Sequence, residues 1–159
     1  MKGCEILKKI IVIVSLIIGF NFHTNTYAKS FNSLPLTKSS DQWSIKINQA
    51  DLDKVNEPKL TKAKKGVFNV YSLDISNIGD RNINNVRIEA FRDEPNSKTY
   101  YELFTNEGDI LVKEGSSYHH SNFPISVKAK ILKIDITWEK TINENQRRHF
   151  KETFIFHQK

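Results

Sequence analysis

Cysteine is almost absent from this 159-residue chain, which has a single one at position 4. Without a second cysteine the chain cannot form an internal disulfide, which is the usual reinforcement of small secreted domains. Cys4 also precedes the apolar run of residues 10–22, whereas a lipid-attached cysteine would follow such a run at its cleavage site. The domain must therefore be held together by burial of apolar side chains, which a chain of this size can achieve.

Motifs for catalysis and ligand binding are missing as well. There is no Gly-x-Ser-x-Gly sequence, no phosphate loop and no Asp-x-Asp-x-Asp calcium loop. No Cys/His or Asp/Glu spacing matches a zinc site. His119 and His120 are adjacent, so an extended strand would point them to opposite faces of a sheet. We expect no catalytic residue, no metal ion and no cofactor.

The N-terminus has the three-part layout of a secretory signal peptide. A basic segment with Lys2, Lys8 and Lys9 precedes the apolar residues 10–22, and a polar segment ends at Ala28. The apolar run is shorter than the roughly 20 residues that span a bilayer comfortably. We expect a secreted or cell-surface protein with cleavage after Ala28. An uncleaved membrane anchor is the alternative.

The charge balance limits the partners. Removing residues 1–28 takes away three lysines and one glutamate, so Lys plus Arg falls from 24 to 21, Asp plus Glu falls from 18 to 17, and the net charge falls from +6 to +4. A mild positive excess suits an anionic cell wall or membrane surface. It lacks the concentrated basic face of nucleic-acid-binding proteins. The many Lys, Ile and Asn residues, with no cysteine after residue 28, indicate a low-GC Gram-positive bacterium.

Alternation of apolar and polar residues is the strongest positive signal. It runs through residues 67–76 and returns at residues 86–91 after a connection around Gly79. Two half-buried strands joined by a Gly/Asn-rich turn are typical of an antiparallel β-sandwich. The predicted inward-facing residues are Tyr71, Leu73, Ile75, Val86, Ile88 and Ala90.

Further strands are predicted by the same criteria over residues 42–48, 99–105, 110–112, 118–124, 125–138 and 149–157. The 125–138 pattern changes phase at the adjacent residues Ile131 and Leu132, which indicates either a β-bulge or two strands separated by a bend. With seven to eight short strands and no convincing helix, the fold class is an all-β antiparallel sandwich. Residues 29–41 are expected to be a flexible leader and residues 42–159 the sandwich domain.

Residues 73–91 resemble the CARDB-type and related immunoglobulin-like modules of bacterial surface proteins. In those modules a strand ends in Asn-x-Gly, and a polar loop, an apolar plug and a second alternating strand follow. Asn77 and Gly79 match the turn, Ile83 the plug, and Val86 and Ile88 the second strand. The resemblance implies an immunoglobulin-like fold with adhesive or accessory roles, and it transfers no catalytic residue.

A basic loop over residues 59–65 is the densest charge cluster after the signal peptide. The strand at 99–105 is aromatic on both faces, so one face must meet the core while the other is exposed unless something covers it. Aromatic residues could stack on a carbohydrate, but inter-sheet packing is their commoner role in β-sandwiches. The predicted binding surface comprises Lys59, Lys62, Lys64, Lys65, Tyr100 and Phe104.

These observations predict an exported, monomeric, non-catalytic immunoglobulin-like module of a Gram-positive bacterium. It would act in binding or structure at the cell envelope. Its expected partner is an anionic cell-wall polymer, a membrane surface or another envelope protein, and not nucleic acid. The alternatives are a small secreted enzyme with a loop-borne site and a secreted toxin or antagonist that uses residues 59–65 as its contact.

Overall fold

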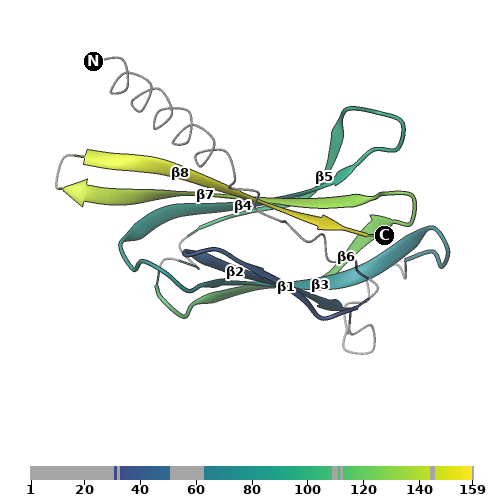
Figure 1. The fold of residues 1–159 in the computed structure, drawn as a ribbon, viewed down its shortest axis with the longest axis horizontal. Helices are drawn as coiled ribbons and strands as arrows, with labels where there is room; N and C mark the ends of the chain where they lie inside the picture. The colour runs from purple at the N-terminus through teal and green to yellow at the C-terminus, as the bar shows by residue number, and fades with distance from the viewer. Residues whose placement is uncertain are drawn as a thin grey trace, which may run out of the picture.

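Two four-stranded antiparallel sheets pack face to face in a computed structural model of the chain (Figure 1). The structure describes residues 31, 33–50, 63–108, 111, 113–143 and 146–158, so the predicted signal peptide, Lys59 and Lys62 lie outside the described part. No helix in the described part is long and apolar enough to cross a membrane. The strands are β1 (Leu36–Ser39), β2 (Trp43–Gln49), β3 (Phe68–Asn77), β4 (Ile83–Asp93), β5 (Tyr100–Glu107), β6 (Ser117–Ser126), β7 (Ile131–Asn143) and β8 (Gln146–His157).

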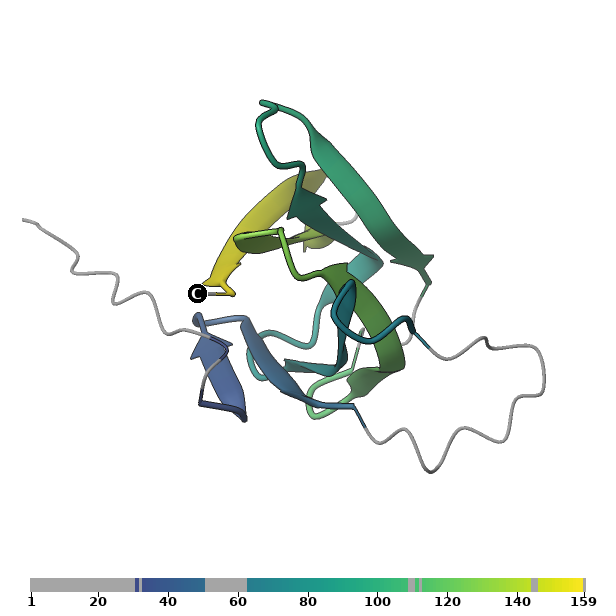
Figure 2. The same ribbon diagram turned by 90° about the vertical axis from the view of Figure 1, so that its right-hand side faces the viewer.

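The strand orders are β1-β2-β3-β6 in the first sheet and β5-β4-β7-β8 in the second. The chain changes sheet between β3 and β4, between β5 and β6, and between β6 and β7, as Figure 2 shows from one end. The two strands with the clearest alternation, β3 and β4, therefore face each other across one core. The predicted all-β sandwich is confirmed.

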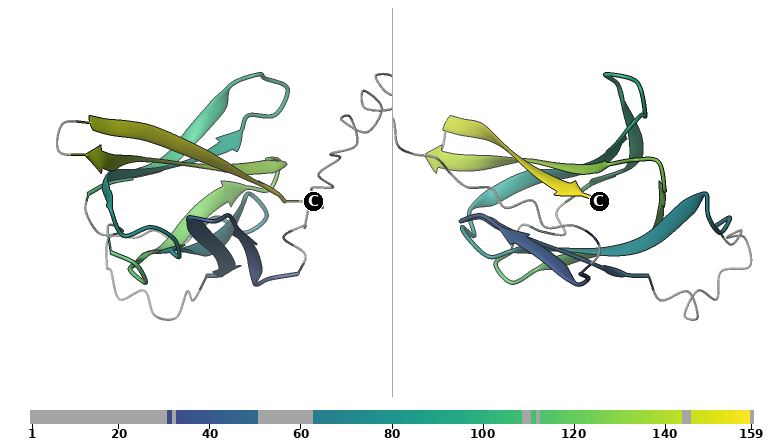
Figure 3. Two further views of the ribbon diagram at one scale, coloured as in Figure 1. Left: turned by 60° about the vertical axis from the view of Figure 1, so that its left-hand side comes forward. Right: turned by 45° about the vertical axis from the view of Figure 1, so that its right-hand side comes forward.

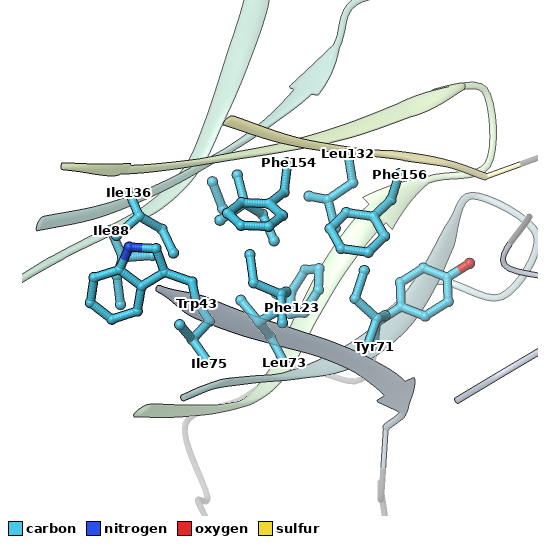
Figure 4. Packing of buried hydrophobic residues seen from close by; sticks show 14 of the residues in the cluster. Trp43, Tyr71, Leu73, Ile75, Ile88, Phe123, Leu132, Ile136, Phe154 and Phe156 are labelled. Atoms are coloured by element: carbon cyan, nitrogen blue, oxygen red, sulfur yellow. The ribbon is translucent and has the colours of Figure 1, made fainter. Parts of the chain in front are cut away.

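The core lies between the two sheets (Figure 4). Ile75 of β3 is fully buried on one side, and Val86, Ile88 and Ile134 of β4 and β7 are buried on the other. The predicted inward faces of these strands are therefore correct. Each such side chain contributes about 1.5–3 kcal/mol of hydrophobic stabilisation relative to an exposed position.

Large aromatic side chains fill much of this core. Trp43 is fully buried and meets Trp138 edge to face, with ring centroids 5.4 Å apart. Phe123 of β6 is buried as well. For these three residues, core packing is confirmed over an exposed stacking platform.

The predicted flexible leader over residues 29–41 is wrong in its second half, because residues 36–39 form β1. Leu36 is buried and pairs with Ile47 of β2. Phe31 is also buried and stacks on Tyr71 with ring centroids 4.8 Å apart. The sequence of this stretch shows no periodicity. Its residues form a strand because they pair with the outer edge of β2.

Lys38 closes the side of the sandwich where β1 faces β8. Its ammonium group donates a hydrogen bond to the Ile155 carbonyl at 2.5 Å and lies over the Phe156 ring, 5.3 Å from the centroid. Burial lowers the pKa of Lys38. The Lys38 side chain therefore links the two sheets, because it donates a hydrogen bond to a β8 carbonyl that faces away from β7.

The phase change in residues 125–138 is a bend between two strands and not a bulge. β6 ends at Ser126 and β7 begins at Ile131. In the turn between them, the Ala129 amide donates to the Ser126 carbonyl at 3.0 Å. The chain passes here from the first sheet to the second, which explains why the inward parity changes.

Asn77 organises the connection that leaves β3. Its side chain is fully buried and every polar atom is used. The amide group donates to the carbonyls of Leu111 (3.0 Å) and Asp80 (3.2 Å), and its oxygen accepts from the Gln42 side chain (2.7 Å) and the Gly79 amide (3.1 Å). Three separate segments, at Gln42, at Gly79–Asp80 and at Leu111, are thereby fixed to the end of one strand.

Gly79 lies against the β1–β2 turn so closely that only glycine fits. A Cβ atom there would be 2.7 Å from the Asp41 carbonyl oxygen and 2.8 Å from the Gln42 side-chain oxygen. Both distances are well inside van der Waals contact, and one of the two groups is backbone. The Asn-x-Gly sequence is thus explained by hydrogen bonding at Asn77 and by close packing at Gly79.

Candidate functional site

Two predicted binding residues, Lys64 and Lys65, are exposed in the turn that leads into β3. The amides of Val67 and Phe68 both donate to the Lys64 carbonyl at 3.1 Å, which fixes the turn. Val67 is 38% and Phe68 is 37% exposed. Apolar surface therefore adjoins the two lysines.

The β6–β7 turn adds two more lysines at the same end of the sandwich. The Val127 amide donates to the Val67 carbonyl at 3.0 Å, so this turn is bonded to the start of β3. Lys128 and Lys130 are exposed on it. We call this surface the basic end, and it comprises Lys64, Lys65, Val67, Phe68, Lys128 and Lys130.

Asp93 anchors the basic end to the second sheet. Its carboxylate accepts hydrogen bonds from the backbone amides of Lys130 and Ile131, each at 2.8 Å. No carboxylate among the described residues forms an ion pair with the four ammonium groups of the basic end. Their charge is therefore available to a soluble or polymeric anion.

The predicted Tyr100 lies on the second sheet and is 46% exposed. The ammonium group of Lys133 lies 4.9 Å from its ring centroid and 4.5 Å from that of Phe91. Its neighbour Tyr101 is 58% exposed beneath the Arg92 guanidinium, at 4.6 Å. The exposed rings of β5 are thus already covered in part by cations of this chain.

Phe104 does not share a face with Tyr100, so this part of the predicted surface is wrong. The β4–β5 register shifts between Ala90 and Phe91, and the shift reverses the parity of β5. Phe104 therefore faces inward, where it stacks on His120 with ring centroids 4.1 Å apart and packs against the core. A bulge of this kind changes which side chains share a face without any mark in the sequence.

His120 lies in the seam between β5 and β6. The Tyr118 hydroxyl and His120 Nδ1 are 3.0 Å apart, and the ring is enclosed by Phe104 and Phe123. Burial lowers the pKa of His120, and the neighbouring His119 lowers it further. The folded protein therefore favours the neutral imidazole.

We expect this seam to make stability depend on pH. Below the ordinary histidine pKa of about 6.5, the unfolded chain takes up a proton at His120 while the folded protein does not. The free energy of unfolding should therefore fall as pH drops below about 6.5. Above that pH, His120 is neutral in both states and no stability is lost through it. Urea unfolding at pH 7.5, 6.5 and 5.5 measures it, and the His120→Phe variant should lose less stability across this range. Equal losses in both proteins would contradict the assignment.

His119 faces the opposite way, as predicted for adjacent residues of a strand. Its Nδ1 atom is 2.6 Å from Asp74 Oδ1, and Asp74 Oδ2 accepts from the Asn48 side chain at 2.7 Å. His119 is exposed, and Asp74 and Asn48 are half-buried beside it on the outer face of the first sheet. No group of three or more His, Cys, Asp or Glu side chains in the described part of the chain is placed to hold a metal ion.

Asp135 is the most buried carboxylate on the outer face of the second sheet, with 4% side-chain exposure. Burial opposes its charge, but hydrogen bonds from Lys151 (2.7 Å), Thr153 (2.8 Å) and Lys133 (3.2 Å) outweigh that cost and lower its pKa. Because its partners already satisfy it, Asp135 is suited to holding the sheet together and not to binding a ligand.

A shallow depression of about 280 Å³ lies beside the start of β4. Its lining is formed by Arg81, Asn82, Ile83, Asn84 and Thr141. Arg81 is the single titratable residue among them, and it is ion-paired with Glu114. The depression therefore does not bring acid–base groups together.

Lys128 and Lys130 were missed by the sequence-based prediction because they are far from Lys64 and Lys65 in the chain. The signal that could have indicated them was the shift in the apolar alternation at Ile131 and Leu132. Once it is taken as a turn, Lys128 and Lys130 lie at its tip. Their proximity to the start of β3 still required the pairing of β3 with β6.

Comparison with known proteins gives two matches. Residues 27–159 match the model of a family described as YozF-like secreted protein. The chain is also 33% identical over 159 residues to the protein named "Uncharacterized protein YozF" from Bacillus subtilis (strain 168), an alignment that covers 91% of this chain and 92% of the relative. No solved structure matches.

Proposed function

The chain belongs to the YozF-like secreted protein family, and on this premise we propose that it is a non-catalytic module that binds anionic cell-wall polymer. The basic end is the contact surface. The family description supports the secreted location. The organism of the relative, Bacillus subtilis, supports a Gram-positive envelope as the setting.

One observation carries the proposal: four exposed lysines on two hydrogen-bonded turns have no acidic partner among the described residues. Lysines held close together by a rigid scaffold attract a polyanion over a distance set by the ionic strength. The anchoring of the turn by Asp93 keeps this arrangement fixed. A preformed charge pattern loses little entropy on binding.

A wall polymer fits the basic end better than a lipid bilayer does. Stable membrane binding needs an apolar face or a lipid chain in addition to basic residues. Among the described residues of the basic end, the exposed apolar surface is limited to Val67 and Phe68, each less than half exposed. An anionic polymer needs the lysines alone, and the two apolar side chains can contact its backbone.

The strand order supports the immunoglobulin-like type of sandwich. In immunoglobulin domains strands B and E lie in one sheet and C, F and G in the other. Here β3 and β6 take the places of B and E, and β4, β7 and β8 those of C, F and G. In variable domains the binding loops B–C and F–G lie at one end of the sandwich. The basic end is formed by the connections that precede β3 and β7, so it lies at the opposite end.

We expect the exported protein to sediment with purified cell walls at low salt and to be released as salt rises. With four lysines engaged, affinity should fall roughly tenfold or more between about 50 and 200 mM salt, by analogy with polyanion binding that releases counterions. Replacing Lys64, Lys65, Lys128 and Lys130 with glutamine should abolish the salt-sensitive retention.

The matched control replaces four exposed basic residues elsewhere: Lys46, Arg81, Lys113 and Arg148 with glutamine. It removes the same charge and should retain wall binding within about twofold, because surface lysines away from the contact matter little. Equal loss in the two variants would contradict a localised site. Retention on acidic-lipid vesicles and not on walls would replace the polymer with a membrane as the partner.

A further inference from the structure

β8 forms one edge of the second sheet, and β7 is its single neighbour there. Its C-terminal part is covered, because Lys38 donates to the Ile155 carbonyl and the Phe31 amide donates to the His157 carbonyl at 3.1 Å. Residues 146–153, which we call the free edge, form no backbone hydrogen bond outside the β7–β8 ladder with any described residue. Their outward amide and carbonyl groups can accept another strand.

The free edge is remote from the basic end. β7 is 13 residues long; it begins beside the basic end at Ile131 and reaches the β7–β8 hairpin at Asn143. This hairpin extends beyond the first sheet (Figures 1 and 3), so the first sheet does not cover the beginning of the free edge. A partner strand can therefore approach it from the side without moving any of the eight described strands.

Positive charge dominates the free edge. Arg147, Arg148, His149 and Lys151 are all exposed, and Glu152 is the single acid. Arg147 (3.4 Å) and His149 (3.6 Å) reach Glu139 on the neighbouring strand, and Lys151 is paired with Asp135 of the same strand at 2.7 Å. Arg148 has no ion pair with any described residue, so a net positive charge remains for a partner.

Apolar side chains alternate with these charges. Phe150 is 38% exposed and stacks on Trp138, with ring centroids 5.6 Å apart and planes inclined by 16°. Ile142 on the opposing strand is 46% exposed. One face of β8 thus carries Arg147, His149 and Lys151, and the other carries Arg148 beside the stacked pair of Phe150 and Trp138.

We propose that the free edge binds an extended, acidic segment of another protein by β-strand addition. Backbone hydrogen bonds to an open edge supply affinity in this mode, and alternate side chains supply specificity. Acidic residues in one row of the segment would share Arg147, His149 and Lys151 with their present partners Glu139 and Asp135. An acidic residue at one end of the other row would meet Arg148. Apolar residues in the other row would cover Phe150, as cross-strand neighbours do in a sheet.

A second copy of this chain is a poor occupant because it carries the same positive excess. Glu152 adds to this, since its carboxylate points inward from an edge strand and its Oε2 atom is buried without a hydrogen-bond partner in the described part of the chain. An inward charge on an edge is a device that discourages self-pairing. A partner segment with a hydroxyl opposite Glu152 satisfies that oxygen.

The probe for this inference is an eight-residue peptide, blocked at both ends, that alternates glutamate with valine or threonine. Added to the exported protein, it should shift amide NMR signals of β8 and its neighbour β7. Two further peptides, N-methylated at the odd or at the even residues, test backbone pairing. One should bind at least about tenfold more weakly and the other nearly unchanged, because only alternate amides face the edge.

The role of charge is tested by replacing Arg147 and Arg148 with glutamine, which should lower the affinity for the peptide roughly tenfold. The control replaces Lys64 and Lys65 with glutamine, removes the same charge and should change affinity by less than about twofold. Equal effects of the two methylated peptides, or no shift on β8, would overturn the inference. A dimer formed through β8 in sedimentation equilibrium would overturn it in favour of a second copy.

Discussion

Replacing Ile134 with alanine is expected to lower the free energy of unfolding by about 2–5 kcal/mol, the range for large-to-small changes in a core. Ile134 is fully buried on β7, where it pairs with Ala90 of β4 on one side and Phe154 of β8 on the other. Removing the distal atoms of Ile134 leaves a cavity in the core. The neighbouring strands β4 and β8 cannot close it, because both are hydrogen-bonded to β7. Equilibrium unfolding in urea measures the loss.

The matched control for Ile134 is the exposed Lys46 of the first sheet. Lys46→Ala should change stability by less than about 0.5 kcal/mol, as is usual for surface sites. Ile75→Ala in the first sheet should match Ile134→Ala, because both side chains belong to one core. A loss below about 0.5 kcal/mol for either isoleucine would show that the sheets do not share that core.

Asn77→Leu should be destabilising to a similar degree, by about 3–5 kcal/mol. Leucine has the same branched skeleton of heavy atoms but is larger, and it makes none of the four side-chain hydrogen bonds of Asn77. The Leu111 carbonyl and the Gly79 amide would lose their partners, and each buried unsatisfied group costs about 1–3 kcal/mol. The loss should appear in the urea midpoint and in faster amide exchange at Gly79.

Asn77→Asp separates hydrogen bonding from shape. The carboxylate keeps the acceptor for Gln42 and Gly79 but turns an oxygen toward the carbonyls of Leu111 and Asp80, so we expect a loss close to that of the leucine variant. The exposed Asn82 is the control, and Asn82→Ala should cost less than about 0.5 kcal/mol. Full stability of Asn77→Asp would contradict the donor role of the amide.

The strands with long alternating patterns could be predicted from sequence, because a period of two over six or more residues fixes both the strand and its inward face. Residues 67–76 and 86–91 are of this kind, and Ile75, Val86 and Ile88 are buried as expected. The Asn-x-Gly connection was also visible, although its hydrogen bonds to Gln42 and Leu111 were not.

β1 could not be predicted, because four residues with one buried apolar side chain carry no periodicity. Leu36 is buried by the edge of β2 that it meets, and Lys38 by β8, so both depend on contacts distant in sequence. Position in the fold, and not local propensity, decides such a strand.

The binding surface was predicted only in part for the same physical reason. The bulge in the β4–β5 ladder turns Phe104 inward and leaves Tyr100 outward, although the two share a parity in the sequence. Lys128 and Lys130 join Lys64 and Lys65 through pairing between strands that are far apart in the chain. A cluster of lysines in the sequence identifies one basic loop. Lysines from two loops can be recognised as one surface only when the strand pairing is known.

Wall retention of two double variants, measured side by side at low salt, tests the central claim most directly. Lys64→Gln/Lys65→Gln at the basic end and Arg147→Gln/Arg148→Gln at the free edge remove the same charge from opposite ends of the sandwich. We expect the first variant to be released from walls several-fold more readily than the wild type, and the second to be retained like the wild type. Equal release of both would contradict a dedicated basic end and leave net charge alone as the cause of binding.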